Sequence, residues 1–132
     1  MTLQVELVSP ERILYSGEAD MVVCRTTDGD IAFLTDHAPF VGALVEWPVR
    51  VILPGGQGEV AAAVHGGFVE VSENRVTVLS DLAEMADQID LERALSLKEW
   101  AEQHIHEQHD AEIEAALRRA HARIALLADR PH

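Results

Sequence analysis

Ile89-Asp90 marks the one point in this chain where the spacing of hydrophobic residues changes. Before it, hydrophobic and polar residues alternate, as in Leu3-Gln4-Val5, so each segment has one hydrophobic and one polar face, which is typical of β-strands. After it, hydrophobic residues recur at steps of four, three, four and three, at Ile113, Leu117, Ala120, Ile124 and Leu127. This second spacing predicts an amphipathic helix that lies against another helix.

Short strands are predicted throughout the first 88 residues. The segments expected to form strands are residues 3–8, 13–15, 20–26, 31–34, 43–46, 49–53, 60–64, 68–71 and 76–79. Turn-forming residues separate several of them, such as the glycines of Pro54-Gly55-Gly56-Gln57-Gly58 and the asparagine Asn74. Many short strands without intervening helices favour an antiparallel β-sandwich or barrel.

Two helices are predicted after this β part. Asp90 is a candidate N-cap for a helix that reaches about residue 105, and Asp110 for a second that reaches about residue 128. The short connection between them favours an antiparallel hairpin. The inner face of the first helix is expected to carry Ala94, Leu97, Ala101 and Ile105. The predicted fold class is therefore α+β, with a β-sandwich over residues 1–88 and a two-helix hairpin over residues 89–132.

The formal net charge of −13 argues against binding to nucleic acid. Neutralising phosphates requires clustered lysine and arginine side chains, and the chain has a single lysine, Lys98. The negative charge lies mostly in residues 1–89, which hold 14 acidic and 4 basic side chains. A basic partner is therefore expected at the β part and an acidic partner at the helical part.

The lone Cys24 follows the hydrophobic run Met21-Val22-Val23, which predicts a buried thiol rather than a nucleophile. A single cysteine rules out a disulfide within the chain and fits a reducing compartment. The sequence has neither a signal-peptide pattern nor a run of about 20 hydrophobic residues, so we expect no direct insertion into a membrane.

Few residues are candidates for catalysis or metal binding. His104, His106 and His109 form an H-x-H-x-x-H pattern. On a helix the first two point in directions about 160° apart, because each residue turns the chain by about 100°. This favours a polar tip of the hairpin over a zinc site, whose ligands must converge. No glycine-rich loop leads into a helix and no strand-to-helix nucleophile turn is found, so the sequence predicts neither a catalytic nor a metal site.

Four stretches, taken in order, resemble one known family. They are residues 27–31 running on to His37-Ala38-Pro39, residues 66–71, residues 74–81 and residues 89–94. In sequence, spacing and two-part organisation the chain resembles the epsilon subunit of F-type ATP synthase, the counterpart of the mitochondrial delta subunit. It departs from the family at Ala32, where a glycine is usual, and at Thr35-Asp36, where Pro-Gly is usual.

The resemblance implies a rotor subunit without a catalytic site. In the family, the sandwich binds the gamma subunit and sits on the ring of c subunits, which couples proton-driven rotation to ATP synthesis. The helical hairpin folds against the sandwich or extends along gamma toward the alpha and beta subunits, where it hinders ATP hydrolysis. The implied location is the cytoplasmic face of the bacterial plasma membrane, as a peripheral part of the F1 sector.

The resemblance also assigns partner contacts. Asp30 matches an acidic position that faces the c ring, and His37 follows it in what is expected to be the same loop. Arg118, Arg119 and Arg123 cluster at helical spacing and would meet the alpha and beta subunits. The alternatives are that Asp30 is only a turn residue beside Gly29 and that the arginines form a solvated face.

Some bacterial members of the family bind a regulatory ATP in the folded hairpin, although none requires a cofactor. The matching residues here are Glu84, Ile89, Asp90, Arg93 and Ala94, with Arg119 and Arg123 as phosphate ligands from the second helix. Trp100 stands where nucleotide binders carry an arginine. The alternative is that Asp90 caps the helix, Arg93 is ion-paired and Ile89 packs on the sandwich.

Two other functions remain as alternatives. One is a free nucleotide sensor, and the other is a β-sandwich metalloenzyme that uses His37 and His65; neither accounts for the two helices. A pH response is a further hypothesis, because five of the seven histidines lie in residues 104–132 and imidazoles titrate near neutrality.

Overall fold

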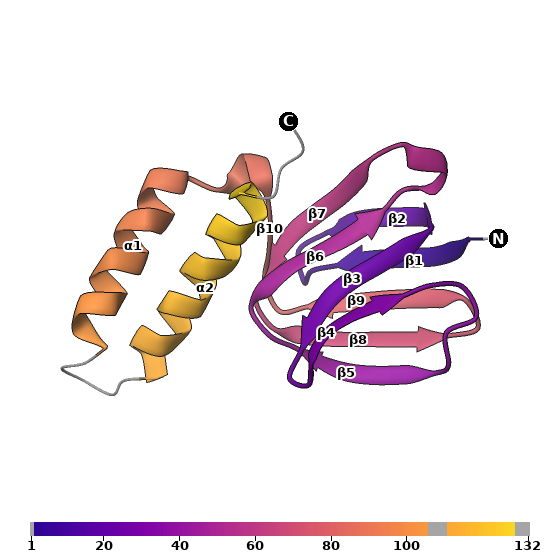
Figure 1. The fold of residues 1–132 in the computed structure, drawn as a ribbon, viewed down its shortest axis with the longest axis horizontal. Helices are drawn as coiled ribbons and strands as arrows, with labels where there is room; N and C mark the ends of the chain where they lie inside the picture. The colour runs from indigo at the N-terminus through magenta and orange to yellow at the C-terminus, as the bar shows by residue number, and fades with distance from the viewer. Residues whose placement is uncertain (1, 106–110, 129–132) are drawn as a thin grey trace.

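The computed structural model describes residues 2–105 and 111–128, in which ten strands precede two helices (Figure 1). The strands are β1 (Leu3–Val8), β2 (Ile13–Ala19), β3 (Met21–Thr26), β4 (Gly29–Phe33), β5 (Phe40–Leu44), β6 (Trp47–Ile52), β7 (Glu59–Val64), β8 (Gly67–Ser72), β9 (Arg75–Ser80) and β10 (Ala83–Met85). The helices are α1 (Leu91–His104) and α2 (Ala111–Ala128). Two 3-10 turns, η1 (Pro54–Gly56) and η2 (Ala86–Gln88), precede β7 and α1.

The strands form a β-sandwich of two layers. One layer has the order β10-β7-β6-β3, with β4 paired to β3, and the other has the order β5-β8-β9-β1-β2. The layers join where β3 pairs with β5 at a single position, Thr26 with Leu44. The pairing of β1 with β9 is parallel, and the other pairings among the described residues are antiparallel. The predicted fold class is confirmed, with this one parallel pair added.

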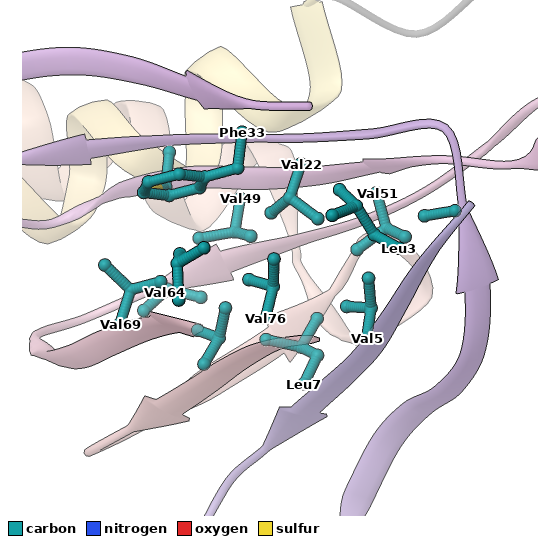
Figure 2. Close-up of a cluster of buried hydrophobic side chains, with 14 of the residues drawn as sticks. Leu3, Val5, Leu7, Val22, Phe33, Val49, Val51, Val64, Val69 and Val76 are labelled. Carbon is teal, nitrogen blue, oxygen red and sulfur yellow. The ribbon is translucent and has the colours of Figure 1, made fainter. Parts of the chain in front are cut away.

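The core lies between the two layers (Figure 2). It forms because alternate residues of each strand point inward, as Leu3, Val5 and Leu7 do in β1, all with exposed fractions of 0%. Cys24 belongs to the same core, and burial raises the pKa of its thiol to about 12. The prediction of a buried thiol is therefore confirmed, and this cysteine is not a nucleophile.

Every predicted strand is observed, most of them within one or two residues of the predicted bounds. β2 is longer than predicted, because it continues to Ala19, and further differences concern β5, β6 and β10. The strand predicted over residues 43–46 is β5, which begins three residues earlier, at Phe40, and ends at Leu44. Residues 45 and 46 lead into β6 instead. β6 begins at Trp47 and includes Pro48, which lies before Arg50, where the ladder with β3 ends. A proline is tolerated there because it removes no hydrogen bond to β3. The three-residue strand β10, which pairs with β7, was not predicted.

Both predicted helices are observed. Asp90 is the N-cap of α1, as predicted, because its carboxylate Oδ1 accepts a hydrogen bond from the Arg93 amide at 3.1 Å. Asp110, the predicted N-cap of α2, lies outside the described residues. On α1, Ala94 and Ala101 are buried, and Leu97 and Ile105 are half-buried. Among the described residues, neither helix is long and hydrophobic enough to cross a membrane.

α2 lies between α1 and the sandwich (Figure 1), so it has two buried faces where one was predicted. Ile113, Ala116 and Ala120 are buried and share one face of the helix, because they are three and four residues apart. Ala122 and Leu126 lie on another face, where they pack with Ala63 of β7. The hydrophobic face predicted for this helix is therefore only partly buried. Three of its residues are half-buried, namely Leu117, Ile124 and Leu127.

Candidate functional site at the junction of sandwich and hairpin

A cavity of about 580 Å³ lies where the helical hairpin joins the sandwich. Its walls come from β10, from the segment that leads into α1, from α1 itself and from α2. The lining residues are Glu84, Gln88, Ile89, Asp90, Arg93, Ala94, Ser96, Leu97 and Arg123. The cavity thus brings together all the residues predicted for nucleotide binding except Arg119, and its volume is in the range of small-molecule sites.

Local hydrogen bonds hold the segment from β10 to α1 in place. The side-chain oxygen of Gln88 accepts from the Met85 amide at 2.9 Å and from the Arg12 guanidinium at 2.8 Å. Ile89 packs against the cluster of Ala63, Ala122 and Leu126, and Asp90 then caps α1. The predicted packing of Ile89 on the sandwich is confirmed, and the entry to α1 is fixed at one wall of the cavity.

Glu84 joins the sandwich to α2. Its Oε1 accepts hydrogen bonds from Arg123 Nε of α2 and from His65 Nε2, each at 2.7 Å. Burial opposes ionisation of Glu84, but the bonds to Arg123 and His65 outweigh it, so the pKa of Glu84 lies below its usual value. The side chains of Arg123 and Glu84 are 20% and 22% exposed, so this ion pair is only partly screened by water.

The remaining predicted ligands are placed differently. Arg93 lines the cavity and, within the described residues, makes no ion pair, so the alternative of an ion-paired Arg93 is not observed in this part of the chain. Arg119 is half-buried on α2 and does not line the cavity. Its positive charge lowers the pKa of His65. Trp100 is 46% exposed and stacks on His104, with ring centroids 4.6 Å apart. Trp100 therefore does not take the place of the missing arginine in the cavity wall.

A second ion pair holds α2 on the sandwich. Arg118 Nε donates to Glu46 Oε2 at 3.1 Å, with the Arg118 side chain 51% exposed. Two of the three arginines predicted to meet the alpha and beta subunits, Arg118 and Arg123, are therefore bound to the sandwich in this state. In this state the less exposed of the two, Arg123, is held between α2 and β10.

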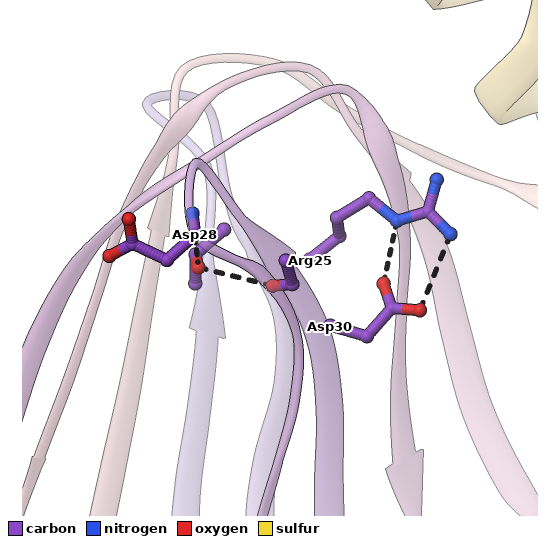
Figure 3. Close-up of polar contacts among 5 residues, drawn as sticks. Arg25, Asp28 and Asp30 are labelled. Atoms are coloured by element: carbon purple, nitrogen blue, oxygen red, sulfur yellow. Dashed lines mark hydrogen bonds and ion pairs between the residues drawn. The ribbon is translucent and has the colours of Figure 1, made fainter.

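The predicted c-ring residues lie at opposite ends of β4. Asp30 is near the tip of the β3–β4 turn, whereas His37 follows the other end of the strand, so the expectation that they share one loop is wrong. Asp30 pairs with Arg25 at 2.6 Å (Figure 3), and the hydrogen bond from Arg25 lowers the pKa of Asp30. The Arg25 guanidinium also lies 3.6 Å from the ring centroid of Trp47. His37 packs edge-on against Phe33, with centroids 4.9 Å apart.

Asp36 has a backbone conformation in which glycine is usually favoured. Its φ is +65°, in the left-handed region where aspartate is tolerated better than most residues. The Asp36 amide donates to Asn74 Oδ1 at 2.6 Å, and Asn74 Nδ2 donates to Asp36 Oδ1 at 3.4 Å. Asn74 has a φ of +60°, as expected for a turn asparagine. Two hydrogen bonds between Asp36 and Asn74 therefore hold this loop.

Comparison with known proteins identifies the family. The family model for the beta-sandwich domain of the ATP synthase delta/epsilon chain matches residues 2–86. The chain belongs to this family. Similar relatives named ATP synthase epsilon chain occur in Streptomyces griseus, 44% identical over 97% of each chain, and in Thermobifida fusca, 44% identical over 92% of this chain and 89% of the relative.

Solved structures of ATP synthases share the fold. A chain of the Euglena gracilis mitochondrial ATP synthase, in a structure of OSCP, F1 and the c-ring, matches with a TM-score of 0.82 at 21% identity, over 96% of this chain and 80% of that one. A chain from the central stalk and c-ring of the Tetrahymena thermophila enzyme matches with a TM-score of 0.52 at 14% identity, over 67% and 69%.

An epsilon chain is an accessory subunit of ATP synthase and not its catalytic chain, and this holds for the present member of the family. Within residues 2–105 and 111–128, no group of three or more His, Cys, Asp or Glu side chains is placed to hold a metal ion. His106 and His109 of the H-x-H-x-x-H pattern lie outside these ranges.

The contact of His65 with Glu84 was not predicted. One signal was present: Ala61, Ala63 and His65 alternate with the core residues Ala62 and Val64. Small residues on the outer face of a strand allow close approach of a helix, and His65 continues that face.

Proposed function

We propose that the chain is a rotor subunit of F-type ATP synthase that transmits proton-driven rotation of the c ring through gamma and restrains ATP hydrolysis. In this proposal residues 1–88 form the anchoring domain and residues 89–132 the regulatory domain, in the peripheral F1 sector at the cytoplasmic face of the bacterial plasma membrane. The family membership supports it, as do the names of its structural neighbours, which are assemblies with a central stalk or c-ring.

The observation that carries the regulatory part is the small interface between hairpin and sandwich. Its buried cluster consists of Ala63, Ala122 and Leu126, and two ion pairs flank it. These residues are separate from the core between the two sheet layers. The hairpin can therefore detach without opening that core. Docked and detached states that differ by a few kcal/mol are within the range that a partner or ligand can shift.

An uncovered hydrophobic row on the other layer is our proposed gamma-binding surface. Phe68 of β8 lies beside Leu79 of β9, and Ile13 of β2 continues the row across β1. Phe68 is 56% exposed and Ile13 is 63% exposed. Monomeric proteins seldom expose a contiguous hydrophobic patch without a partner. α2 covers β6 and β7 of the opposite layer, so a docked hairpin leaves this row accessible to gamma.

Polar residues are our proposed contacts with the c ring and with the alpha and beta subunits. We propose that Asp30, at the exposed β3–β4 turn, faces the polar loops of the c ring, with His37 contributing from the other end of β4. After detachment, Arg118, Arg119 and Arg123 would face acidic surfaces of the alpha and beta subunits. The Arg118 and Arg123 side chains exchange Glu46 and Glu84 for these new partners.

The test uses ATP hydrolysis by a matched alpha-beta-gamma core with three added chains. The full-length chain is expected to bind gamma and inhibit, because the hairpin can reach the catalytic subunits. The chain cut after Gln88 is expected to bind without inhibiting. A Phe68→Asp chain is expected to lose gamma binding, because a carboxylate would be desolvated in the interface.

Failure of both the full-length and the shortened chain to bind gamma would refute the rotor proposal. A free nucleotide sensor would show that result while still binding ATP. Equal inhibition by the full-length and shortened chains would instead refute the regulatory role of the hairpin.

We further propose a regulatory ATP in the cavity at the junction. Arg93 and Arg123 supply positive charge for phosphates, and the cavity is large enough for a nucleotide. Glu84 already holds Arg123, and Trp100 stands in place of a further arginine. We therefore expect weak binding, in the millimolar range, in which phosphate competes with Glu84 for the Arg123 guanidinium.

Calorimetric titration with ATP tests this ligand. The native chain is expected to release heat at millimolar ATP, and an Arg93→Ala chain to release none. A Trp100→Arg chain is expected to bind roughly tenfold to a hundredfold more tightly, the typical contribution of one charge-assisted hydrogen bond. Absence of heat with both the native and the Trp100→Arg chain would exclude ATP as the ligand.

A further inference from the structure

We propose that His65 makes docking of the helical hairpin dependent on pH: protonation of its imidazole releases α2 from the sandwich. The release would supply the detached hairpin of the proposed function, but docking is a property of the free chain and is measured without any partner. Failure of one proposal is therefore distinguishable from failure of the other.

The side chain of His65 is buried on the side of β7 where α2 packs. Ala63 and His65 point to the outer face of β7, and Ala63 packs against Ala122 and Leu126 of α2. The His65 side chain is only 2% exposed. Detachment of the hairpin would uncover it, because α2 lies directly over this face of the sheet.

The hydrogen bonds of His65 fix its tautomer. Nε2 lies 2.7 Å from Glu84 Oε1, and an ionised carboxylate only accepts, so Nε2 carries the proton. Nδ1 is then an unprotonated acceptor. It is buried and has no hydrogen-bond partner among the described residues. Protonation would place an N–H donor at Nδ1 with no acceptor in reach, and burying such an unpaired group is unfavourable.

Charged groups approach His65 from each neighbouring element. Glu84 of β10 favours the protonated form, whereas Arg123 and Arg119 of α2 oppose it. The carboxylate of Asp81 lies over the adjacent Gly66, where a Cβ would come within 2.9 Å of its Oδ2. The two cations belong to the element that detaches. Movement of α2 therefore removes the groups that oppose protonation and leaves Glu84, which favours it.

These contacts mean that protonation of His65 weakens docking of the hairpin. Burial lowers the pKa of docked His65, and the bond to Glu84 only partly offsets it. The uncovered imidazole has an ordinary pKa of about 6.5, so the detached state binds the proton more readily. Docking is thus strongest above about pH 7.5 and weakens as the pH falls through about 6.5, by at most about tenfold per pH unit. Glu84 remains ionised in this range because its own pKa is lowered.

Fluorescence energy transfer within the full chain measures docking. Dyes are attached at Glu70→Cys on β8 and Glu99→Cys on α1, which are exposed positions, and the buried Cys24 stays unlabelled. The ratio of detached to docked chain is expected to rise several-fold between about pH 7.5 and about pH 5.5. A His65→Gln chain, which keeps an amide donor for Glu84, is expected to lose this rise. A His121→Gln chain, altered on the exposed side of α2, is expected to keep it.

An unchanged pH response in the His65→Gln chain, or a native chain without any response, would overturn the proposal. If the His65→Gln chain does not fold, nuclear magnetic resonance titration of the native chain decides. The His65 imidazole is expected to titrate below the ordinary value of about 6.5. Titration of His65 at or above that value would equally overturn the proposal.

Discussion

Replacing Gly67 by alanine is expected to lower the free energy of unfolding by about 3–6 kcal/mol, a large part of the stability of a small domain. Gly67 has a φ of +120°, which an alanine adopts only with strain. A Cβ at this position would also lie 2.1 Å from the Leu79 carbonyl oxygen and 2.8 Å from the Ser80 Cα. Both atoms belong to the backbone of β9, which pairs with Gly67, so neither can move without opening the β8–β9 ladder. Denaturant unfolding followed by circular dichroism measures the loss.

Gly29→Ala is the matched control for this substitution. Gly29 has a φ of +116°, close to that of Gly67, but a Cβ there would meet no atom within 4 Å. Alanine at position 29 is expected to cost only the backbone strain, about 1–2 kcal/mol. The difference between the two substitutions isolates the clash with β9. Equal losses would show that backbone strain alone, and not the close approach of the strands, requires glycine at position 67.

Replacing Ala122 by leucine is expected to detach the helical hairpin while leaving the sandwich folded. Ala122 and Ala63 are both fully buried where α2 lies on β7. A leucine has no room there, and overpacking of this kind typically costs about 1–3 kcal/mol. Docking should therefore weaken by roughly 5- to 150-fold. The energy-transfer pair at positions 70 and 99 reports the detachment, and stronger inhibition of ATP hydrolysis is expected under the proposed function.

An Ala111→Leu chain controls for the added volume, because Ala111 is exposed on the same helix. It is expected to dock like the native chain. The unfolding midpoint of the sandwich should be unchanged in the Ala122→Leu chain, since Ala122 lies outside the core between the sheet layers. Loss of the sandwich together with the hairpin would show that the two parts depend on each other for stability.

Alternation of hydrophobic residues predicted most of the fold, and its failures have local causes. β1 alternates from Leu3 to Leu7 and was predicted with its observed bounds. The run from Phe40 to Leu44 is almost wholly hydrophobic, so its spacing does not fix where β5 begins. β6 begins two residues before the predicted strand and includes Pro48, whose position beyond the ladder with β3 cannot be seen in the sequence. β10 is too short to show any alternation.

The candidate site also has one part that local sequence predicts and one part that only the packing of the elements determines. Glu84, Ile89, Asp90, Arg93 and Ala94 lie in one short segment of chain, so a motif could place them together, and they do line one cavity. Arg119 depends instead on the rotation of α2 about its axis. That rotation is set by the second buried face of α2, on the sandwich, which the helical spacing did not reveal. The contact of His65 with Glu84 and Arg123 joins three elements and follows only from their packing.

The parallel pairing of β1 with β9 has a consequence for how the chain folds. Leu7 pairs with Val78, so the first strand to be synthesised lacks one of its two neighbours until almost the whole sandwich has been made. Contacts between such distant residues slow folding, because a long loop must close before they form. The two helices, by contrast, pair with each other across a short connection. We therefore expect the sandwich to set the overall folding rate and the hairpin to form quickly at the end, both on the ribosome and after each detachment.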